Sequence, residues 1–210
     1  MNLMNDALNP TRLSVSTCLP RCFYARPTLE VARDLLGRHL VRDVGGERLV
    51  GRIVEAEAYG GVLDTACHVA KGRTPRNDVM FGPPGHAYIY LIYGIYDMLN
   101  LITERDGEPG GVLIRAITPV EGEASMIARR GGKRGRTLAN GPGKLTRAMS
   151  ITRAELNRHD VCTSEKLWIE AGEPVDDARV IAGPRIGIDY AEPRDRDAPW
   201  RLRVASERRT

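Results

Sequence analysis

Two carboxylates and an aromatic residue occupy alternate positions in EAEAY, residues 55–59. If this segment is a β-strand, Glu55, Glu57 and Tyr59 share one face with Ile53, and the small residues between them face a core. Carboxyl groups two residues apart on a strand lie roughly 6–7 Å from each other, a separation close to that of the paired acids of glycoside hydrolysis. The alternative is an edge strand with solvated acids, and the spacing by itself leaves both open.

Four of the seven tyrosines fall within residues 88–96, at positions 88, 90, 93 and 96. The surrounding segment AYIYLIYGIYDMLNLIT, residues 87–103, predicts two apolar strands that meet near Tyr93 and Gly94. An aromatic side chain at the tip of a hairpin is badly placed for a core and well placed to insert between stacked bases. The alternative is a tyrosine-rich face of an ordinary sheet.

Two further polar residues stand where they need partners. Arg115 interrupts the apolar strand VLIRAI, residues 112–117. A guanidinium there requires an anion, either a structural carboxylate or a ligand phosphate. His68 lies in a polar loop with Asp64 four residues before it. These two residues are spaced to form a pair, and the alternative for His68 is a structural hydrogen bond.

The cysteines do not suggest a metal centre. Cys18 and Cys22 lie close together, but neither a second close pair nor a nearby histidine completes a zinc site. We therefore expect reduced thiols, no metal and no cofactor.

The predicted elements are mostly strands with a few short helices. TLEVARDLLG, residues 28–37, predicts a helix that Thr28 caps and Gly37 ends. The turn Gly45-Gly46 joins two predicted strands. The tail from Leu167 predicts two or three more short strands. This pattern indicates one α+β domain over residues 26–210, and we expect residues 1–25 to form a flexible arm.

Charge favours a polyanionic partner. The net charge is +4, and residues 129–136, RRGGKRGR, hold five cations. Each contact of such a cation with a phosphate releases counterions; the alternative is a solvated loop. The sequence shows neither an apolar run long enough to span a membrane nor a secretion signal, so we expect an intracellular protein, in the cytoplasm or nucleoid if the source is bacterial.

Six stretches together resemble the alkyladenine DNA glycosylase family, also called the 3-methyladenine or methylpurine glycosylases. The resemblance covers roughly residues 28–155 and weakens toward the end; residues 1–25 match nothing, and the loop 68–74 is of variable length. It implies a curved, mostly antiparallel sheet with flanking helices and a protruding β-hairpin. The stretches are LLGRHLVR, GRIVEAEAYGG, DTACHV, GRTPRNDVMFGPPGHAYIYLIYGIYDMLN, VLIRAITPVEG and NGPGKLTRAMSI.

The resemblance also implies roles for individual residues. Glu57 corresponds to the general base and Arg115 to the residue that helps hold the attacking water, while Glu55 has no assigned role. Asn100 corresponds to the side chain that crowds the purine 2-position. The walls of the base pocket correspond to Tyr59, His68 and Tyr90. The residues assigned to DNA binding are Tyr93, which fills the gap left by the flipped base, and Ile95, Arg76 and Lys144.

The implied activity is that of a monofunctional DNA glycosylase acting as a monomer. It would flip alkylated or deaminated purines, of the 3-methyladenine or hypoxanthine type, from double-stranded DNA and hydrolyse the N-glycosidic bond with a water activated by Glu57. Two alternatives stay open: a glycosylase–lyase that uses Lys144 or Lys71 as nucleophile, and a non-catalytic module that binds damaged DNA. A sugar O-glycosidase fits less well, because it would have no use for the basic segment.

Overall fold

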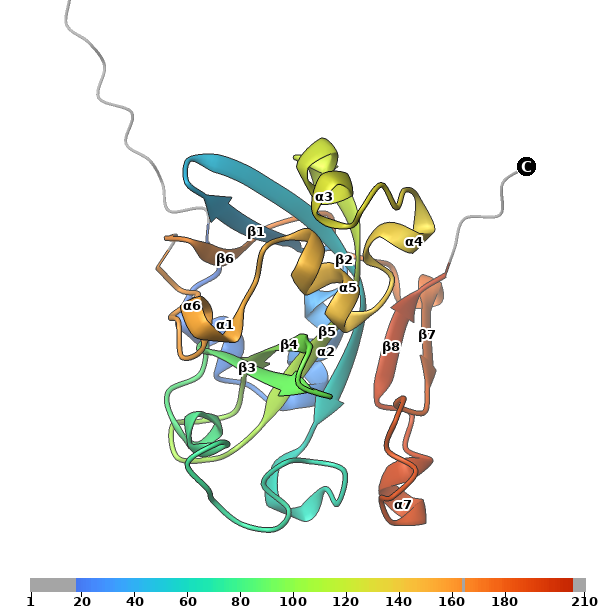
Figure 1. The fold of residues 1–210 in the computed structure, drawn as a ribbon. Helices are drawn as coiled ribbons and strands as arrows, with labels where there is room; N and C mark the ends of the chain where they lie inside the picture. The colour runs from blue at the N-terminus through green and yellow to red at the C-terminus, as the bar shows by residue number, and fades with distance from the viewer. Residues whose placement is uncertain (1–17, 164, 206–210) are drawn as a thin grey trace, which may run out of the picture.

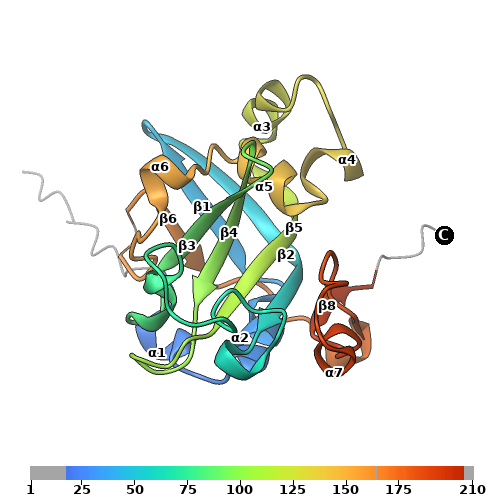
Figure 2. The ribbon, with the colours of Figure 1, turned by 60° about the horizontal axis from the view of Figure 1, so that its bottom comes forward.

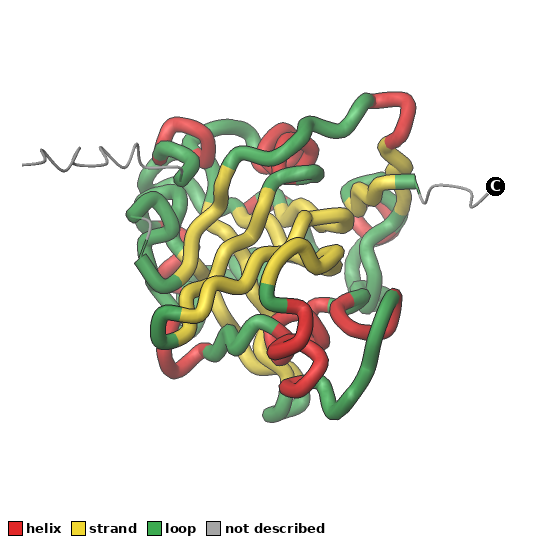
Figure 3. The backbone as a smooth tube through the Cα atoms, turned by 90° about the horizontal axis from the view of Figure 1, so that it is seen from above, coloured by secondary structure: helices red, strands yellow, loops and turns green. Residues whose placement is uncertain are grey.

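The computed structural model describes residues 18–163 and 165–205, and these residues form an α+β domain built on one eight-stranded, antiparallel sheet (Figure 1). Figure 3 shows the strands at the centre with helices and loops around them. The strands are β1 (His39–Val44), β2 (Glu47–Tyr59), β3 (Ala87–Ile92), β4 (Tyr96–Ile102), β5 (Gly111–Glu121), β6 (Leu167–Glu170), β7 (Val180–Gly183) and β8 (Arg201–Val204).

The long strand β2 organises the sheet. The order is β3-β4-β5-β2-β1-β6, so β2 pairs with β5 along one edge (Figure 2). Its other edge is shared: β1 pairs with the first half of β2, and β8 pairs with residues 55–57 near its end. The strand β8 in turn carries β7. This arrangement brings β8 against EAEAY, the segment that holds the two carboxylates.

The turns follow local sequence. Gly45 and Gly46 form the two-residue turn between β1 and β2, both with positive φ, as the sequence predicts. The predicted hairpin is also confirmed as β3 and β4, with Tyr93 and Gly94 in its turn, also at positive φ. The tail from Leu167 contains three short strands within the described residues, β6 to β8.

Helices α2 (Thr28–Leu35) and α5 (Pro142–Ala148) cover one face of the sheet. The helices α2 and α5 both pack against β5, α2 also against β2 and α5 also against β4, and their apolar residues join the main core. The helices are α1 (Arg21–Tyr24), α2 (Thr28–Leu35), α3 (Glu123–Arg129), α4 (Arg136–Ala139), α5 (Pro142–Ala148), α6 (Arg153–Leu156) and α7 (Pro193–Arg196). Short 3-10 helices are η1 (Gly61–Leu63), η2 (Asp78–Phe81) and η3 (Asp177–Arg179). Among the described residues, none of the helices is long and apolar enough to cross a membrane.

The predicted helix at residue 28 is present, with one correction at its start. Gly37 follows its last turn with φ 87°, as expected. Thr28 does not cap the helix: it is the first helical residue, and its hydroxyl donates to Glu104 Oε1 at 2.7 Å. The Thr28 hydroxyl, which the local pattern assigns to capping the helix, is thus bonded to a carboxylate 76 residues away.

The sequence predicts a flexible N-terminal arm over residues 1–25. Its first 17 residues lie outside the described part of the chain. Residues 18–25 include α1, whose Tyr24 is buried and belongs to the main core. The domain therefore begins its packing before residue 26.

Candidate active site

The register of the sheet gathers the candidate residues on the face opposite the helices. Glu57 on β2 is paired with Leu113 on β5, Leu113 with Asn100 on β4, and Asn100 with Tyr88 on β3. Residues paired directly across an antiparallel sheet point to the same side, and so do residues two positions further along. Tyr59, Arg115 and Tyr90, two positions on, therefore share this face. The alternate positions, among them Ala56, Ala58, Ile114 and Leu99, enter the main core.

One member of the expected face lies on the other side. Strand alternation predicts Ile53 beside the carboxylates, but it is fully buried in the main core with Ala56 and Ala58. The ladder between β2 and β5 shifts register between Ile53 and Glu55, and again between Glu55 and Ala56. A β-bulge adds a residue to one strand and breaks the alternation of faces, which explains the correction.

Glu57 is fully buried, and the described residues give it three hydrogen-bond donors. Its Oε2 accepts from the Tyr59 hydroxyl at 2.9 Å and from Arg115 Nη1 at 3.1 Å. Its Oε1 accepts from the backbone N–H of Ile186 at 2.8 Å. Burial raises the pKa of Glu57 above its ordinary value, and the charge of Arg115 with these hydrogen bonds opposes that rise.

Arg115 links the two carboxylates. Besides its bond to Glu57, its Nε lies 3.4 Å from Glu55 Oε1, and Arg201 on β8 donates to the same oxygen at 3.2 Å. The anions that the sequence requires for Arg115 are therefore carboxylates of the chain itself, Glu57 and Glu55. The two acids are not equivalent, because Glu57 is fully buried whereas the Glu55 side chain is 22% exposed.

An aromatic pocket adjoins this acid pair. Tyr59 connects the pocket to the carboxylate, because its ring lines the pocket while its hydroxyl bonds Glu57. The His68 and Tyr90 rings meet edge to face, with centroids 4.4 Å apart. The lining residues are Tyr59, Cys67, His68, Met80, Tyr88, Tyr90 and Asn100. Glu57 is not among them and lies behind Tyr59.

His68 has a different partner from the one expected. Its Nδ1 lies 3.0 Å from the Tyr88 hydroxyl, whereas both oxygens of Asp64 bind Arg185, a residue far along the chain. Although the side chain keeps part of its surface open to solvent, desolvation by its surroundings lowers the pKa of His68 to about 4, and the charge of Arg76 contributes. The imidazole is therefore neutral at pH 7.

Asn100 combines a place in the pocket with a structural task. It is buried, and its Nδ2 donates to the carbonyl oxygens of Tyr88 at 3.2 Å and Met98 at 3.3 Å. Its amide nitrogen thus helps to hold β3 against β4. Both readings of Asn100, as a gate of the pocket and as a support of the hairpin, agree with its position.

The residues assigned to DNA binding do not line the pocket, and their side chains are exposed. Tyr93 is 85% exposed and Ile95 69% exposed in the turn of the hairpin. Arg76 holds its guanidinium carbon 5.5 Å from the centre of the Tyr90 ring, at the pocket. Lys144 on α5 donates to Asn140 Oδ1 at 3.0 Å. The projection of the hairpin from the domain stays a prediction.

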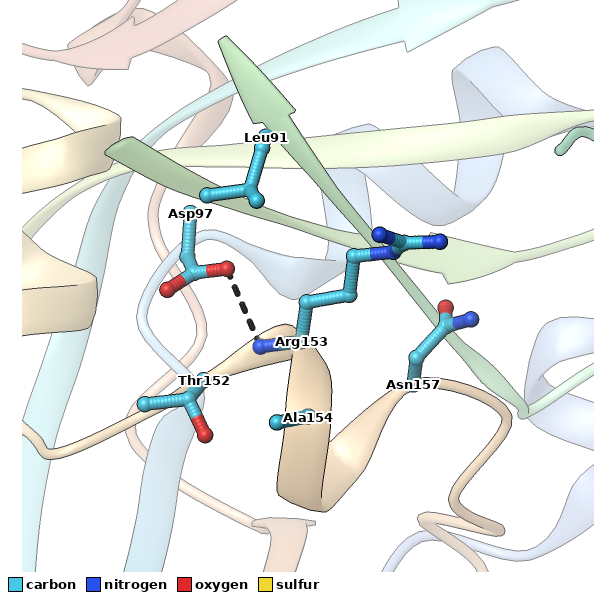
Figure 4. A pocket seen from close by; sticks show the side chains of 6 residues that line it. All are labelled: Leu91, Asp97, Thr152, Arg153, Ala154 and Asn157. Atoms are coloured by element: carbon cyan, nitrogen blue, oxygen red, sulfur yellow. Dashed lines mark hydrogen bonds between the residues drawn. The ribbon is translucent and has the colours of Figure 1, made fainter. Parts of the chain in front are cut away.

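A second, wider depression lies beside the hairpin (Figure 4). Leu91 and Asp97 form one side of it, and Arg153 at the start of α6 donates its backbone N–H to Asp97 Oδ1 at 3.0 Å. None of its lining residues contacts Glu57. The smaller aromatic pocket is the candidate active site, because a wall of that pocket is bonded to the buried carboxylate.

Sequence reasoning missed the segment that holds Glu57 from the C-terminal side. Ile186 supplies a hydrogen bond to Glu57, and Arg185 before it packs its guanidinium carbon 4.8 Å from the Tyr59 ring centre. The local sequence GPRIGID carries no periodic signal, so this role was not readable from it. Nor do the described residues contain a group of three or more side chains suited to hold a metal ion.

The fold and site define a single-domain α+β protein with a buried, arginine-bound carboxylate behind an aromatic pocket. The sequence profile of the methylpurine-DNA glycosylase family matches residues 22–208, and the chain belongs to this family.

Related proteins align with this chain along most of their length. A protein of Methanocella arvoryzae is 58% identical over 185 residues, which cover 88% of this chain and 90% of the relative. One of Myxococcus xanthus is 51% identical, covering 82% and 83%, and one of Carboxydothermus hydrogenoformans is 47% identical, covering 88% and 93%. All three are provisionally named as 3-methyladenine DNA glycosylases.

Proposed function

We propose that this protein is a monofunctional DNA glycosylase that removes alkylated and deaminated purines, of the 3-methyladenine and hypoxanthine type, from double-stranded DNA. The observation that carries the proposal is the buried Glu57, bonded to Arg115 and to the pocket wall Tyr59. Family membership and the names of the relatives support the same activity. The protein acts as one glycosylase domain, whose core already includes Tyr24, as a monomer, on genomic DNA, in the nucleoid if the source is bacterial.

The target base must leave the duplex before it can react. Chemistry on a base inside a helix requires extrusion, and a damaged, weakly paired base costs less to extrude. The pocket offers aromatic faces from Tyr59 and Tyr90, on which a cationic alkylated purine stacks favourably. Because His68 is neutral at pH 7, it does not repel that cation. Tyr93, Ile95, Arg76 and Lys144 hold the duplex around the extruded nucleotide.

Glu57 activates the attacking water. Each carboxylate oxygen has two acceptor positions, and Oε2 uses both for Tyr59 and Arg115. Oε1 accepts from Ile186 N–H and keeps one position for a water molecule. The water oxygen bonds to C1′ of the sugar, its proton passes to Glu57, and the electron pair of the C1′–N bond leaves with the base. The carboxylate also stabilises the positive charge that develops on the sugar.

Single-turnover base release tests this proposal. Wild-type protein in excess is mixed with duplexes that contain one hypoxanthine or one 3-methyladenine, and with an undamaged duplex. We expect an abasic site in the damaged strand and none in the undamaged control. Binding of damaged DNA without base release would indicate a non-catalytic module instead. Trapping of a covalent adduct by borohydride would indicate a lyase that uses Lys144 or Lys71.

A further inference from the structure

Arg185 lies next to the catalytic carboxylate in space and has no role in the mechanism derived above. It is 5% exposed and sits in the segment between β7 and α7. Its Nη1 and Nη2 donate to Asp64 Oδ2 at 2.5 Å and Asp64 Oδ1 at 2.8 Å, a two-pronged ion pair. The same nitrogens donate to the carbonyl oxygens of Ala58 at 2.8 Å and Asp195 at 3.0 Å.

Aromatic rings fix the plane of this guanidinium. Its central carbon lies 4.8 Å from the centre of the Tyr59 ring and 5.0 Å from that of Trp200. Asp64 is held in turn, because Oδ2 also accepts from Gly60 N–H and Oδ1 from Ala66 N–H, each at 3.0 Å. The planar fork of an arginine suits such a site, and a lysine cannot reproduce it.

Two residues adjacent to Arg185, one in sequence and one in space, donate hydrogen bonds to Glu57. Ile186, the residue after Arg185, gives its N–H to Oε1, and Tyr59, which packs on the guanidinium, gives its hydroxyl to Oε2. We propose that Arg185 is a positioning residue, which holds the Tyr59 ring and the Ile186 N–H against Glu57 through its buried pair with Asp64. The proposal rests on the function proposed above and deepens it.

The proposal predicts a change in the acidity of Glu57 when the arrangement loosens. The Ile186 and Tyr59 hydrogen bonds both act to lower the pKa of Glu57 against the effect of burial. If Arg185 no longer holds these donors, the pKa of Glu57 rises further and the ionised base is available only at higher pH. The other charged and titratable groups near Glu57 stay unchanged in this experiment. They are Arg115 on β5, Glu55 on β2, Tyr90 on β3, and Arg201 on β8, which is paired with Glu55.

Arg42 provides a matched control. It is likewise a buried arginine, 2% exposed, which bonds Glu155 Oε2 at 2.6 Å and the carbonyl oxygens of Ser150, Asp43 and Lys166. It lies on β1 and contacts none of the site residues. Arg42→Lys therefore disturbs a comparable buried network without touching Glu57.

The experiment compares Arg185→Lys with Arg42→Lys and the wild type on a hypoxanthine duplex. Melting temperature, affinity for the damaged duplex and the single-turnover rate of base release are measured from pH 5 to 9. We expect both variants to melt lower. Only Arg185→Lys should release base about 10-fold or more slowly, with the acid limb of its rate profile shifted upward by about one pH unit, as the loss of a hydrogen bond to a charged group predicts.

The outcomes separate the two proposals. A wild type that releases no base defeats the proposed function itself. An active wild type with an Arg185→Lys variant of unchanged rate and unchanged acid limb defeats only the positioning role, and so does an equal loss in both variants. If Arg185→Lys does not fold, the double variant Arg185→Gln/Asp64→Asn, which leaves no unpaired buried charge, takes its place with the same expected shift.

Discussion

Replacement of Glu57 by glutamine is the most direct test of the catalytic assignment. Glutamine keeps the size of the side chain and removes its charge and its ability to take a proton. All three hydrogen bonds seen at Glu57 are donated to it, by Tyr59, Arg115 and Ile186. A glutamine oxygen in the Oε2 position keeps the first two bonds, but its NH₂ group then faces the Ile186 N–H and loses the third.

The structure predicts that Glu57→Gln has a small effect on stability and a large effect on the rate of base release. One lost hydrogen bond with a donor left facing a donor costs about 1–3 kcal/mol, and removing a carboxylate whose pKa burial has raised offsets part of that cost. The melting temperature should therefore change modestly. Loss of a general base slows the chemical step by about 100- to 10,000-fold.

Single-turnover base release and equilibrium binding separate the two effects. We expect Glu57→Gln to bind a hypoxanthine duplex about as tightly as the wild type and to release base at least about 100-fold more slowly. Glu55→Gln is the matched control, because it alters the other acid bonded to Arg115. It should lose much less activity. Equal losses in the two variants, or an active Glu57→Gln, would refute the assignment of the base.

Three other predictions concern the residues around this acid. Tyr93→Ser should weaken capture of the flipped base, by about 1–3 kcal/mol of lost base–aromatic stacking, with little change in affinity for undamaged DNA; unchanged fluorescence of a base analogue on binding would remove Tyr93 from this role. Asn100→Ser should raise release of guanine or 7-methylguanine relative to hypoxanthine about 10-fold, because an unmet hydrogen bond and a clash disappear; a constant ratio with a lower melting temperature would assign Asn100 to the hairpin only. His68, with its pKa lowered to about 4, contributes stability above pH 6.5 that is lost as pH falls from 6.5 to 4. A melting temperature of His68→Asn that falls with pH as steeply as that of the wild type across this window would contradict the prediction.

Local features of the fold were predictable from the sequence, because short-range rules govern them. The Gly45-Gly46 turn and the hairpin through Tyr93 follow from the residues that they contain. Glu57 and Tyr59 share a face because alternation on a strand is a local property, and the structure bonds them to each other.

Long-range features were not predictable in the same way. The place of Ile53 depends on a bulge in the pairing of β2 with β5, and no local pattern marks that bulge. The sequence spacing pairs Asp64 with His68 four residues away, whereas its partner in the structure is Arg185, 121 residues distant. The C-terminal contribution to the site depends on β8 completing the edge of β2, a pairing that strand periodicity does not specify.

The position of Glu57 on the sheet has opposite effects on stability and on the proposed reaction. A carboxylate removed from water is costly to ionise, which is why burial raises its pKa and why Arg115 and two other donors surround it. The same low dielectric strengthens the attraction between the fixed anion and the positive charge that develops on the sugar, and fixed donors need no reorganisation during the reaction. A solvent-exposed carboxylate would avoid this cost and would lose this advantage. The face opposite the helix-covered core therefore holds this carboxylate, and its three hydrogen-bond donors act to lower the pKa that burial raises.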